Sequence, residues 1–198
     1  KDVAGSTCGS LMPTAKPVEN IAGIAVTCID NGMPVVMMRA GDFGKSGYET
    51  PAELEADEAL KAQIETIRLE VGPMMNLGDV EHKTVPKMTL LAPARKGGTI
   101  STRTFIPHRV HEAVGVLGAA SVAAACLLPG SVANGFSRFS GGSGSHHLEV
   151  EHPTGSFVVE LDISTNDDEF LVTRTALLRT ARKLMQGSVF VPASILSQ

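Results

Sequence analysis

Two apolar runs early in the chain are separated by Asn31-Gly32. Residues 24–30 and 33–39 are rich in β-branched and other apolar side chains. Asn-Gly between two such runs is a strong signal for a β-hairpin. Pro34 has no amide hydrogen to donate to a strand ladder, so it belongs at an edge or a bulge. The alternative is an irregular turn that presents its backbone amides to a ligand.

One amphipathic helix is predicted after Thr50. Thr50 is a favourable N-cap, Pro51 suits the first helical position, and Gly72-Pro73 is expected to end the helix. A single apolar stripe lies along this otherwise charged segment, formed by Leu60, Ile64, Ile67 and Val71. We expect an outer helix that covers the core and takes no part in chemistry.

The rest of the sequence predicts strands around one buried helix. Residues 113–128 are small and apolar on every side, which is typical of a helix that is buried all round. Strands are expected at 87–92, 99–105, 148–150, 156–163, 170–184 and 189–191, with a flexible loop at 135–147 and a turn at 166–169. Strands wrapped around one small-residue helix indicate an α+β roll rather than a doubly wound sheet.

The composition is that of a globular protein and argues against several functional classes. The 198 residues have a net charge of −4, and 43% of them are hydrophobic. A weakly acidic chain with seven Phe, one Tyr and no Trp is a poor candidate for general nucleic-acid binding. No apolar run reaches the roughly 18 residues of a membrane span. We therefore expect a cytoplasmic protein with neither a nucleic-acid nor a membrane partner.

Cysteine and histidine spacing predicts neither a disulfide framework nor a metal site. Cys8, Cys28 and Cys126 are widely spaced and odd in number, and Cys28 and Cys126 lie in apolar runs where inert core thiols are expected. The segment around Cys8 matches neither a nucleophile elbow nor a phosphate loop. His108 and His111 form an HxxH pair, but no third ligand stands at a fixed position.

A basic stretch without any acid covers residues 83–109 and ends beside the buried helix. Four side chains are expected in the lead-in or the first turn of that helix: Arg103, His108, Arg109 and His111. A helix N-terminus has unpaired amides and the positive end of the dipole, which predicts a carboxylate or phosphate site. A surface strand with scattered cations is the alternative. Lys87 either extends to water or holds a carboxylate in a pocket.

Seven segments, taken in order, carry a resemblance to a known family. They are Gly-Ser-Thr-Cys-Gly-Ser-Leu-Met-Pro-Thr (5–14), Val-Thr-Cys-Ile-Asp-Asn-Gly-Met-Pro-Val-Val (26–36), Met-Asn-Leu-Gly-Asp-Val (75–80), Val-Pro-Lys-Met (85–88), Arg-Thr-Phe-Ile-Pro-His-Arg-Val-His (103–111), Val-Glu-His-Pro-Thr-Gly (150–155) and Arg-Thr-Ala-Arg-Lys-Leu-Met (179–185). Over nearly its whole length the chain resembles the 2-methylaconitate/methylitaconate isomerase family, and within it the branch of 4-oxalomesaconate tautomerases from gallate breakdown.

The resemblance implies a diaminopimelate-epimerase-like fold. In that fold two pseudo-symmetric halves each wrap a β-roll around a central helix, and the active site lies in the cleft between them. Family members are nearly twice as long, so the resemblance implies that this chain is the C-terminal half. Residues 1–20 are then a linker and lead-in loop, and residues 21–198 are the epimerase-like domain. The family's acid and base, a Lys and a Cys, are implied to lie in the other half.

The resemblance also implies a function. A cofactor-independent isomerase would move a proton in an unsaturated tricarboxylate, with the keto–enol tautomerisation of 4-oxalomesaconate expected first. This half would bind the polycarboxylate substrate and be inactive alone, and the whole protein could form a homodimer. The alternatives are a methylaconitate- or methylitaconate-type double-bond isomerase and a non-catalytic carboxylate-binding module. The implied substrate-binding residues are Asn31, Gly32, Met33, Lys87, Met88, Arg103, His108, Arg109 and His111. Related isomerases often have Ser-Met-Gly-Lys where this chain has residues 106–109, so Ile106 lacks that hydroxyl.

Overall fold

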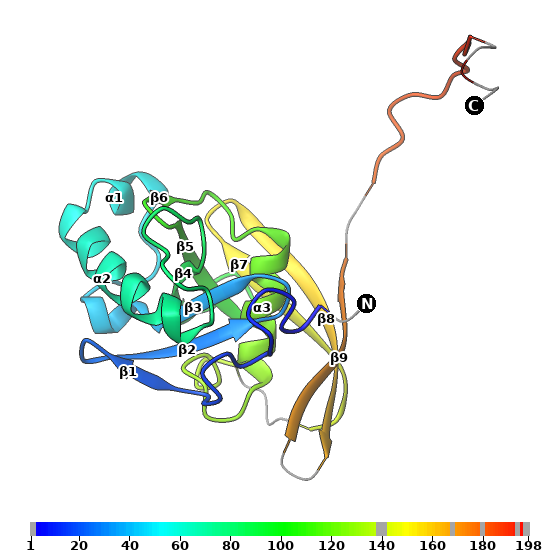
Figure 1. Ribbon diagram of the computed structural model, residues 1–198. Coiled ribbons are helices and arrows are strands. Elements are labelled where there is room, and N and C mark those ends of the chain that lie inside the picture. The colour runs from blue at the N-terminus through cyan, green and yellow to red at the C-terminus, as the bar shows by residue number, and fades with distance from the viewer. Residues whose placement is uncertain (1–2, 138–141, 167–168, 179–180, 193–194, 196–198) are drawn as a thin grey trace.

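The computed structural model describes residues 3–137, 142–166, 169–178, 181–192 and 195. Within these residues one mixed sheet has the strand order β1-β2-β3-β4-β5-β7-β8-β9, with β6 paired to β5 (Figure 1). The strands are β1 (Glu19–Ile21), β2 (Ile24–Asp30), β3 (Pro34–Arg39), β4 (Lys87–Pro93), β5 (Ile100–Ile106), β6 (Arg109–Val110), β7 (Gly144–His152), β8 (Gly155–Asn166) and β9 (Glu169–Leu177). The helices are the 3-10 helix η1 (Ala40–Phe43), α1 (Pro51–Glu55), α2 (Glu58–Met74) and α3 (Val116–Leu127).

Two strand pairs are parallel, and each is joined by a crossover that contains helix. The chain passes from β3 to its parallel neighbour β4 through η1, α1 and α2. It passes from β5 to its parallel neighbour β7 through β6 and α3. The other neighbouring strands are antiparallel, including the predicted hairpin β2–β3, in which Asp30 is opposite Pro34. The α+β class with a mixed sheet is therefore confirmed.

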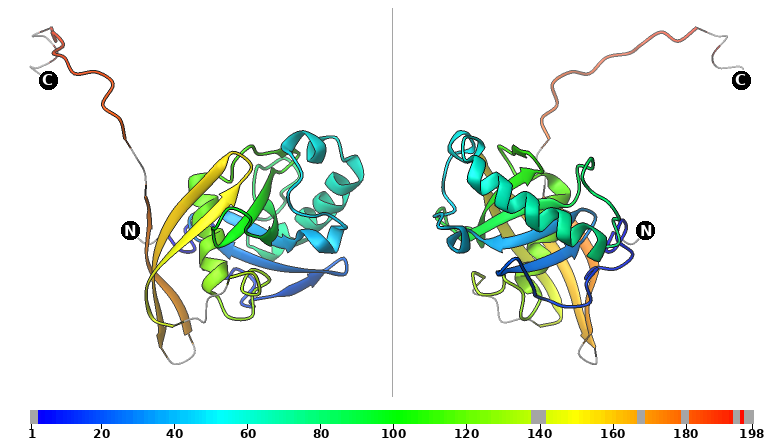
Figure 2. Two further views of the ribbon diagram at one scale, coloured as in Figure 1. Left: turned by 180° about the vertical axis from the view of Figure 1, so that it is seen from behind. Right: turned by 60° about the vertical axis from the view of Figure 1, so that its left-hand side comes forward.

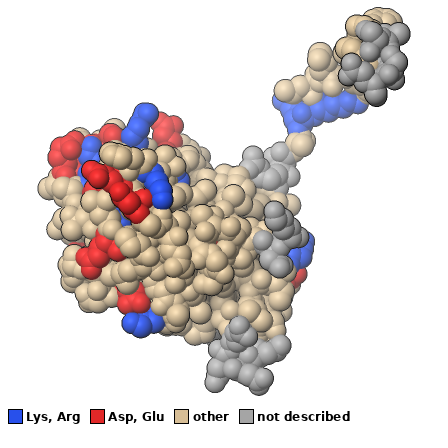
Figure 3. All heavy atoms as spheres, in the orientation of Figure 1, with Lys and Arg blue, Asp and Glu red and all other residues tan. Residues whose placement is uncertain are grey.

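Side chains that alternate along the central strands form two separate cores. In β3, Val36 and Met38 pack with the apolar stripe of α2, whereas Val35 and Met37 pack with α3. The α2 stripe predicted from the sequence is buried, with Leu60, Ile64, Ile67 and Val71 at most 2% exposed. Figure 2 shows α2 lying across one face of the sheet. Charged side chains gather over α1 and α2 in Figure 3, as expected for an outer helical layer.

Helix α3 is buried on all sides after its first turn, as its composition predicts, whereas Leu117 in the first turn is 42% exposed. Residues 118–127 are all buried, and the helix contacts β2, β3, β7, β8 and β9. Strands β7, β8 and β9 continue the sheet past α3, so that the helix lies between them and the central strands (Figure 1). None of the helices in the described ranges is both long and apolar enough to span a membrane.

The helix predicted after Thr50 is in fact two helices. Thr50 caps α1 as expected, but a second helix begins after Asp57, whose side chain accepts a hydrogen bond from the Leu60 amide (3.0 Å). This local cap interrupts the segment between α1 and α2. Pro73 does not end α2, which continues to Met74, because a proline near the end of a helix removes only one of its hydrogen bonds.

The C-terminal part differs from the sequence prediction in three places. β7 begins at Gly144, so His146 and His147 lie in a strand rather than in the predicted loop, because β8 is long enough to pair with them. Residues 138–141 of that loop lie outside the described residues, as do 167–168 of the predicted turn. β9 ends at Leu177 instead of continuing towards residue 184. The strand predicted at 189–191 is wrong for this chain, since these residues pair with no strand in the described structure.

Candidate active site

A hollow of about 300 Å³ opens where the N-terminus of α3 meets the sheet. Met33 contributes from the turn before β3, Lys87 from the start of β4, and Thr104 and Ile106 from the end of β5. His111 and residues 114–118 complete the wall. Most of this lining is apolar, and its few polar groups converge from three different segments, which is the usual character of a small-molecule site.

Lys87 is placed in this hollow by the register of the sheet. It is opposite Val35 in the parallel pair β3–β4, and Val35 faces α3. The Lys87 Nζ donates to the carbonyl oxygen of Thr84 (2.6 Å), and partial burial lowers the pKa of the ammonium group. An ammonium group has three hydrogens, so two of them are available to a carboxylate.

His111 presents an N–H group to the same hollow. Its backbone amide donates to the Thr104 carbonyl (2.7 Å), and its Nδ1 accepts a hydrogen bond from the Ala113 amide (2.9 Å). Because Nδ1 is an acceptor, the neutral ring carries its hydrogen on Nε2. A Cβ added to Gly115 would lie 3.9 Å from Nε2, so this nitrogen faces the start of α3.

The start of α3 supplies backbone donors. The N-cap residue Gly115 has φ 72° and no side-chain oxygen, so no side chain caps the helix. The first amides of a helix have no acceptor within it, and the dipole makes this end positive. Residues 116–118 line the hollow, so these amides, Lys87 and His111 can together hold negatively charged oxygens.

Three of the nine predicted binding residues, Met33, Lys87 and His111, therefore meet in one site. Alternation along the strands turns two others to the opposite face. Met88 is fully buried in the core beneath α2. Arg103 shares the face of Phe105, and its guanidinium donates to the carbonyl oxygens of Glu49 (2.6 Å) and Thr102 (2.8 Å). Burial lowers the pKa of Arg103.

The structure corrects the placement of the residues that precede α3. This helix begins only at Val116, so Arg109 and His111 do not lie in its first turn. Arg109 is exposed in β6, which folds back on β5. His108 is exposed, and its Nδ1 lies 3.8 Å from the Glu65 carboxylate of α2. His108 and Arg109 thus match the alternative of surface cations.

The polar groups of the turn between β2 and β3 donate their hydrogen bonds to other groups of the protein. The Asn31 amide donates to Ser121 Oγ in α3 (3.1 Å), and the Gly32 amide donates to Asp30 Oδ1 (3.2 Å). The Asn31 side chain is fully buried and donates to the Ala120 carbonyl (3.2 Å) and to Thr175 Oγ1 (3.0 Å). These two amides are thus not presented to a ligand.

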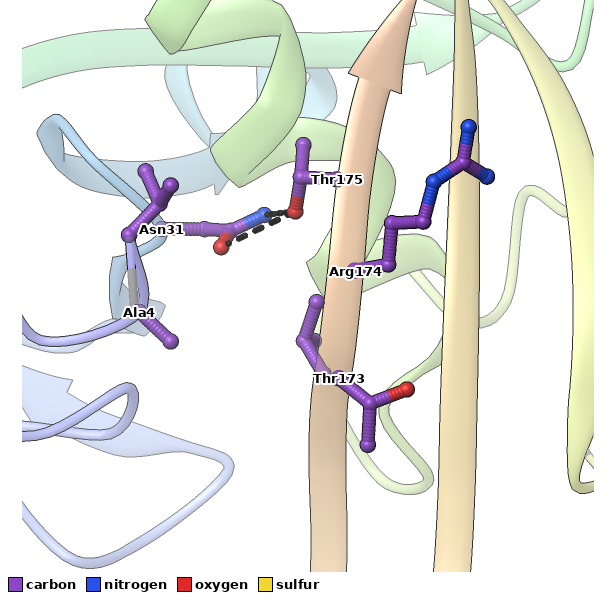
Figure 4. Close-up of a pocket in the computed structure, with 7 residues that line it drawn as sticks. Ala4, Asn31, Thr173, Arg174 and Thr175 are labelled. Atoms are coloured by element: carbon purple, nitrogen blue, oxygen red, sulfur yellow. Dashed lines mark hydrogen bonds between the residues drawn. The ribbon is translucent and has the colours of Figure 1, made fainter. Parts of the chain in front are cut away.

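A second hollow, of about 230 Å³, lies between the N-terminal segment and β9. Figure 4 shows Asn31 and Thr175 hydrogen-bonded to each other beside it. The Arg174 side chain points away from Asn31 towards β8, where it pairs with Glu160 and lies 3.5 Å from Asp162. Because its polar groups already have partners, this hollow is less suited to an anionic ligand than the one at α3.

The chain matches one protein-family model over nearly its whole length. The family model described as PrpF protein matches residues 1–192. The chain belongs to the PrpF family. It is 52% identical over 96% of its length to the 4-oxalomesaconate tautomerase of Pseudomonas putida, of which it covers 51%. It is 53% identical over 96% of its length to the (4E)-oxalomesaconate Delta-isomerase of a Novosphingobium species, of which it covers 52%.

More distant relatives are named for other compounds. The 2-methyl-aconitate isomerase of Shewanella oneidensis is 26% identical over 93% of the chain, which covers 51% of that protein. The crystal structure of a methylitaconate-delta-isomerase superposes with a TM-score of 0.77 at 22% identity, covering all of this chain and 55% of that one, which shows a common fold. The chain thus spans about half the length of the curated relatives it matches.

Two parts of the candidate site are not indicated by the sequence pattern. The pattern predicts Thr104 only as part of a strand, yet it faces the hollow and shares a hydrogen bond with Thr89 (3.0 Å between the Oγ1 atoms). It predicts residues 114–118 only as part of the helix. Gly115, with its positive φ, marks the helix start, and a glycine before an unbroken apolar run was the available signal.

The three thiols of this PrpF chain are far from nucleophilic. Cys8, Cys28 and Cys126 are free and buried. Burial raises the pKa of each to about 12, and for Cys8 the nearby Asp30 carboxylate adds to the rise. A thiol attacks as its thiolate, so none of the three is suited to nucleophilic or acid–base work near neutral pH. The expectation of inert core thiols is supported.

We expect the stability of the chain to fall in mild acid through His152. This residue is 9% exposed, and its ring packs on Phe157 and shares a hydrogen bond with Thr154. Burial, followed by the electrostatic effect of the nearby His111, Lys96 and Arg103, lowers the pKa of His152 below 6.5. As pH falls, His152 is therefore protonated at a higher pH in the unfolded chain than in the folded protein. Stability is lost as pH falls from 6.5 towards the lowered pKa.

Thermal melts at pH 7, 6 and 5 test this. His152→Gln should reduce the loss of Tm between pH 7 and pH 5, whereas His82→Gln, at an exposed position, should leave it unchanged. Equal losses of Tm in the two variants and the wild type would remove His152 as the cause.

Proposed function

We propose that this chain is the substrate-binding half of a 4-oxalomesaconate tautomerase. The observation that carries the proposal is the convergence of the Lys87 ammonium, the His111 N–H and the first amides of α3 on one apolar-walled hollow. A polycarboxylate needs such donors for its charged oxygens and apolar walls for its carbon skeleton. Relatives named for oxalomesaconate, more than 50% identical to this chain, support this choice of substrate.

The proposal includes the finer architecture. Residues 21–198 form the C-terminal half of a diaminopimelate-epimerase-like protein, in which a β-roll encloses α3. The burial of α3 between the central strands and β7, β8 and β9 supports a roll. The roughly doubled length of the relatives supports a second half, which would close the hollow from the other side.

In the proposed mechanism, this half holds the substrate while the other half moves the proton. Lys87 binds one carboxylate, and the amides at the start of α3 bind another. A base in the other half removes a proton from the carbon next to the carbonyl. The C–H electron pair becomes a new C=C bond, and the π pair of the carbonyl moves onto its oxygen. The neutral His111 donates its Nε2 hydrogen bond to that oxygen as negative charge develops. An acid in the other half then donates a proton to that oxygen, which gives the enol.

A chimaera tests the proposed function. In it, this chain replaces the region of the P. putida tautomerase that it matches, and absorbance follows the conversion of 4-oxalomesaconate. We expect turnover by the chimaera and none by the isolated 198 residues, because the proposed acid and base lie in the other half. Turnover by the isolated chain would contradict this division of roles. A folded chimaera that converts 2-methylaconitate but not 4-oxalomesaconate would establish the double-bond isomerase instead. A folded chimaera without either activity would favour the carboxylate-binding module.

A further inference from the structure

His111 follows the short strand β6, which gives it little support of its own. β6 has two residues and pairs with β5 alone in the described part of the chain. The His111 amide donates to Thr104 in β5, and N–H groups alternate in direction along a strand, so the Val110 N–H points away from β5. An isolated pair of strands is marginally stable at best. Contacts from other elements therefore decide where the His111 ring lies.

Glu55, the last residue of α1, bonds to the backbone immediately before His111. Its carboxylate accepts a hydrogen bond from the Val110 amide (2.7 Å), which is the N–H that β5 leaves unpaired. A hydrogen bond to an ionised acceptor is stronger than one between neutral groups. α1 is itself fixed by the capping box of Thr50 and Glu53. The outer helical layer, which the sequence predicts only as a cover for the core, thus supports the candidate site.

Thr154, in the turn between β7 and β8, bonds to the backbone immediately after His111. Its hydroxyl donates to the Glu112 carbonyl oxygen (2.9 Å) and lies 3.2 Å from Nδ1 of His152. A hydroxyl has one hydrogen and a carbonyl oxygen can only accept, so the Nδ1–H of His152 is the donor to Thr154. Two consecutive hydrogen bonds therefore connect the buried His152 to the loop that precedes α3.

We propose that Glu55 and Thr154 are positioning residues that hold the peptide groups on both sides of His111 and so direct its Nε2–H into the α3 hollow. We call these two side chains the His111 clamp. Neither of them lines the hollow, so both act through His111 rather than on the substrate. A hydrogen-bond donor that stabilises a developing oxyanion must be placed accurately, because a shift of about 1 Å can cost roughly a hundredfold in rate. The catalytic role of His111 rests on the proposed function, whereas its position does not.

Amide exchange of the isolated chain, followed by NMR, tests the clamp without any substrate. Glu55→Met should raise the exchange rate of the His111 amide by at least about tenfold, because the loop then loses a charge-assisted bond. Thr154→Val keeps the shape of the side chain and removes the hydroxyl, and it should raise the rate by about threefold, since a bond between neutral groups is lost.

Two matched controls carry the same substitutions at positions that do not contact the loop. Glu58→Met removes an exposed carboxylate that pairs with Lys61 (2.8 Å), the lysine that also lies 4.0 Å from Glu55. Thr173→Val removes a hydroxyl that donates to the Asp162 carbonyl oxygen (3.0 Å). Both controls should leave the exchange rate of the His111 amide unchanged.

Kinetics of the chimaera show whether the clamp serves catalysis. His111 is proposed to bond to the carbonyl oxygen as charge develops on it, so loss of its position should lower kcat rather than raise KM. We expect Glu55→Met to lower kcat for 4-oxalomesaconate by about tenfold and to leave KM within about twofold. Glu55→Gln keeps an oxygen acceptor for Val110, and Thr154→Ser keeps the hydroxyl. Both conservative variants should therefore restore most of the wild-type kcat, which a loss of packing alone would not allow.

Three results would overturn the proposal. The first is an unchanged exchange rate of the His111 amide in both Glu55→Met and Thr154→Val. The second is an active chimaera in which Glu55→Met speeds exchange but leaves kcat unchanged. The third is a loss of kcat in Glu58→Met as large as that in Glu55→Met. A folded wild-type chimaera without activity rejects the proposed function instead, and the exchange rates of the isolated chain then decide whether the clamp holds His111.

Discussion

Lys87→Met in the chimaera is expected to lower kcat/KM for 4-oxalomesaconate by at least about tenfold and up to roughly a hundredfold. A hydrogen bond to a charged group contributes about 1.5–3 kcal/mol, and the half-buried Lys87 ammonium is the charged side chain placed to hold a substrate carboxylate in the α3 hollow. Methionine keeps the length and the apolar stem of the side chain and removes only the ammonium. Steady-state kinetics of the wild-type and variant chimaeras measure the difference.

The same substitution should not destabilise the protein. Burial lowers the pKa of Lys87, which means that the folded state binds this proton less tightly than the unfolded chain does. At pH values below this lowered pKa, the charged lysine therefore reduces the stability of the folded state. The stability recovers as pH rises towards 10.5. Lys87→Met removes this cost, so its Tm near neutral pH should be unchanged or higher.

Lys96→Met is the matched control, because its side chain is exposed on the turn between β4 and β5. It should change kcat/KM by less than about twofold. Equal losses of activity in the two variants, or a fall of Tm that accompanies the loss in Lys87→Met, would exclude Lys87 from carboxylate binding.

Arg68→Leu is expected to lower the free energy of unfolding by about 3–5 kcal/mol. Arg68 lies in α2 and is fully buried. Its guanidinium donates to the carboxylate of Glu65 (2.7 Å) and to the backbone carbonyl oxygens of Val80 (2.7 Å), Glu81, Lys83 and Val85 (3.3 Å each). Leucine would fill part of the space but leave these acceptors, which are buried or partly buried, without their donor. Urea denaturation of the two chains gives the difference.

Arg95→Leu is the control for Arg68→Leu. Arg95 is exposed and stacks its guanidinium on the Tyr48 ring at 3.3 Å from the centroid, a contact that stabilises by about 1 kcal/mol or less. A loss of stability no larger in Arg68→Leu than in Arg95→Leu would contradict the structural role given to Arg68. Because the segment held by Arg68 leads directly into Lys87, the buried arginine also connects the outer helix to the candidate site.

The elements that local signals specify were predictable from the sequence. Asn31-Gly32 between two apolar runs specifies a hairpin, and the hairpin is present. The small apolar residues of 113–128 specify a helix buried on all sides, and α3 is buried in this way from Gly118 to Leu127. For Lys87 the sequence allows two interpretations, an exposed ammonium and a pocket residue. Only the position of the parallel partner β3, which lies far away in sequence, places it in the hollow.

Long-range geometry explains most of what the sequence did not reveal. Arg103 and Thr104 are neighbours in the chain, but the pleat of β5 turns one towards Glu49 and the other towards α3. The clustering of the basic residues in one segment therefore does not indicate which of their side chains face the α3 hollow. Arg109 was expected in the first turn of the helix because nothing local indicated the short strand β6.

The hollow at the start of α3 is expected to bind an unsaturated polycarboxylate. An NMR titration of the isolated chain with trans-aconitate, an unreactive stand-in for the substrate in the absence of the other half, detects that binding at the residues concerned. Saturable shifts should appear at the amides of residues 116–118 and at His111, and Lys87→Met should abolish them. Shifts confined to His108 and Arg109, or none up to millimolar ligand in a folded chain, would contradict the claim.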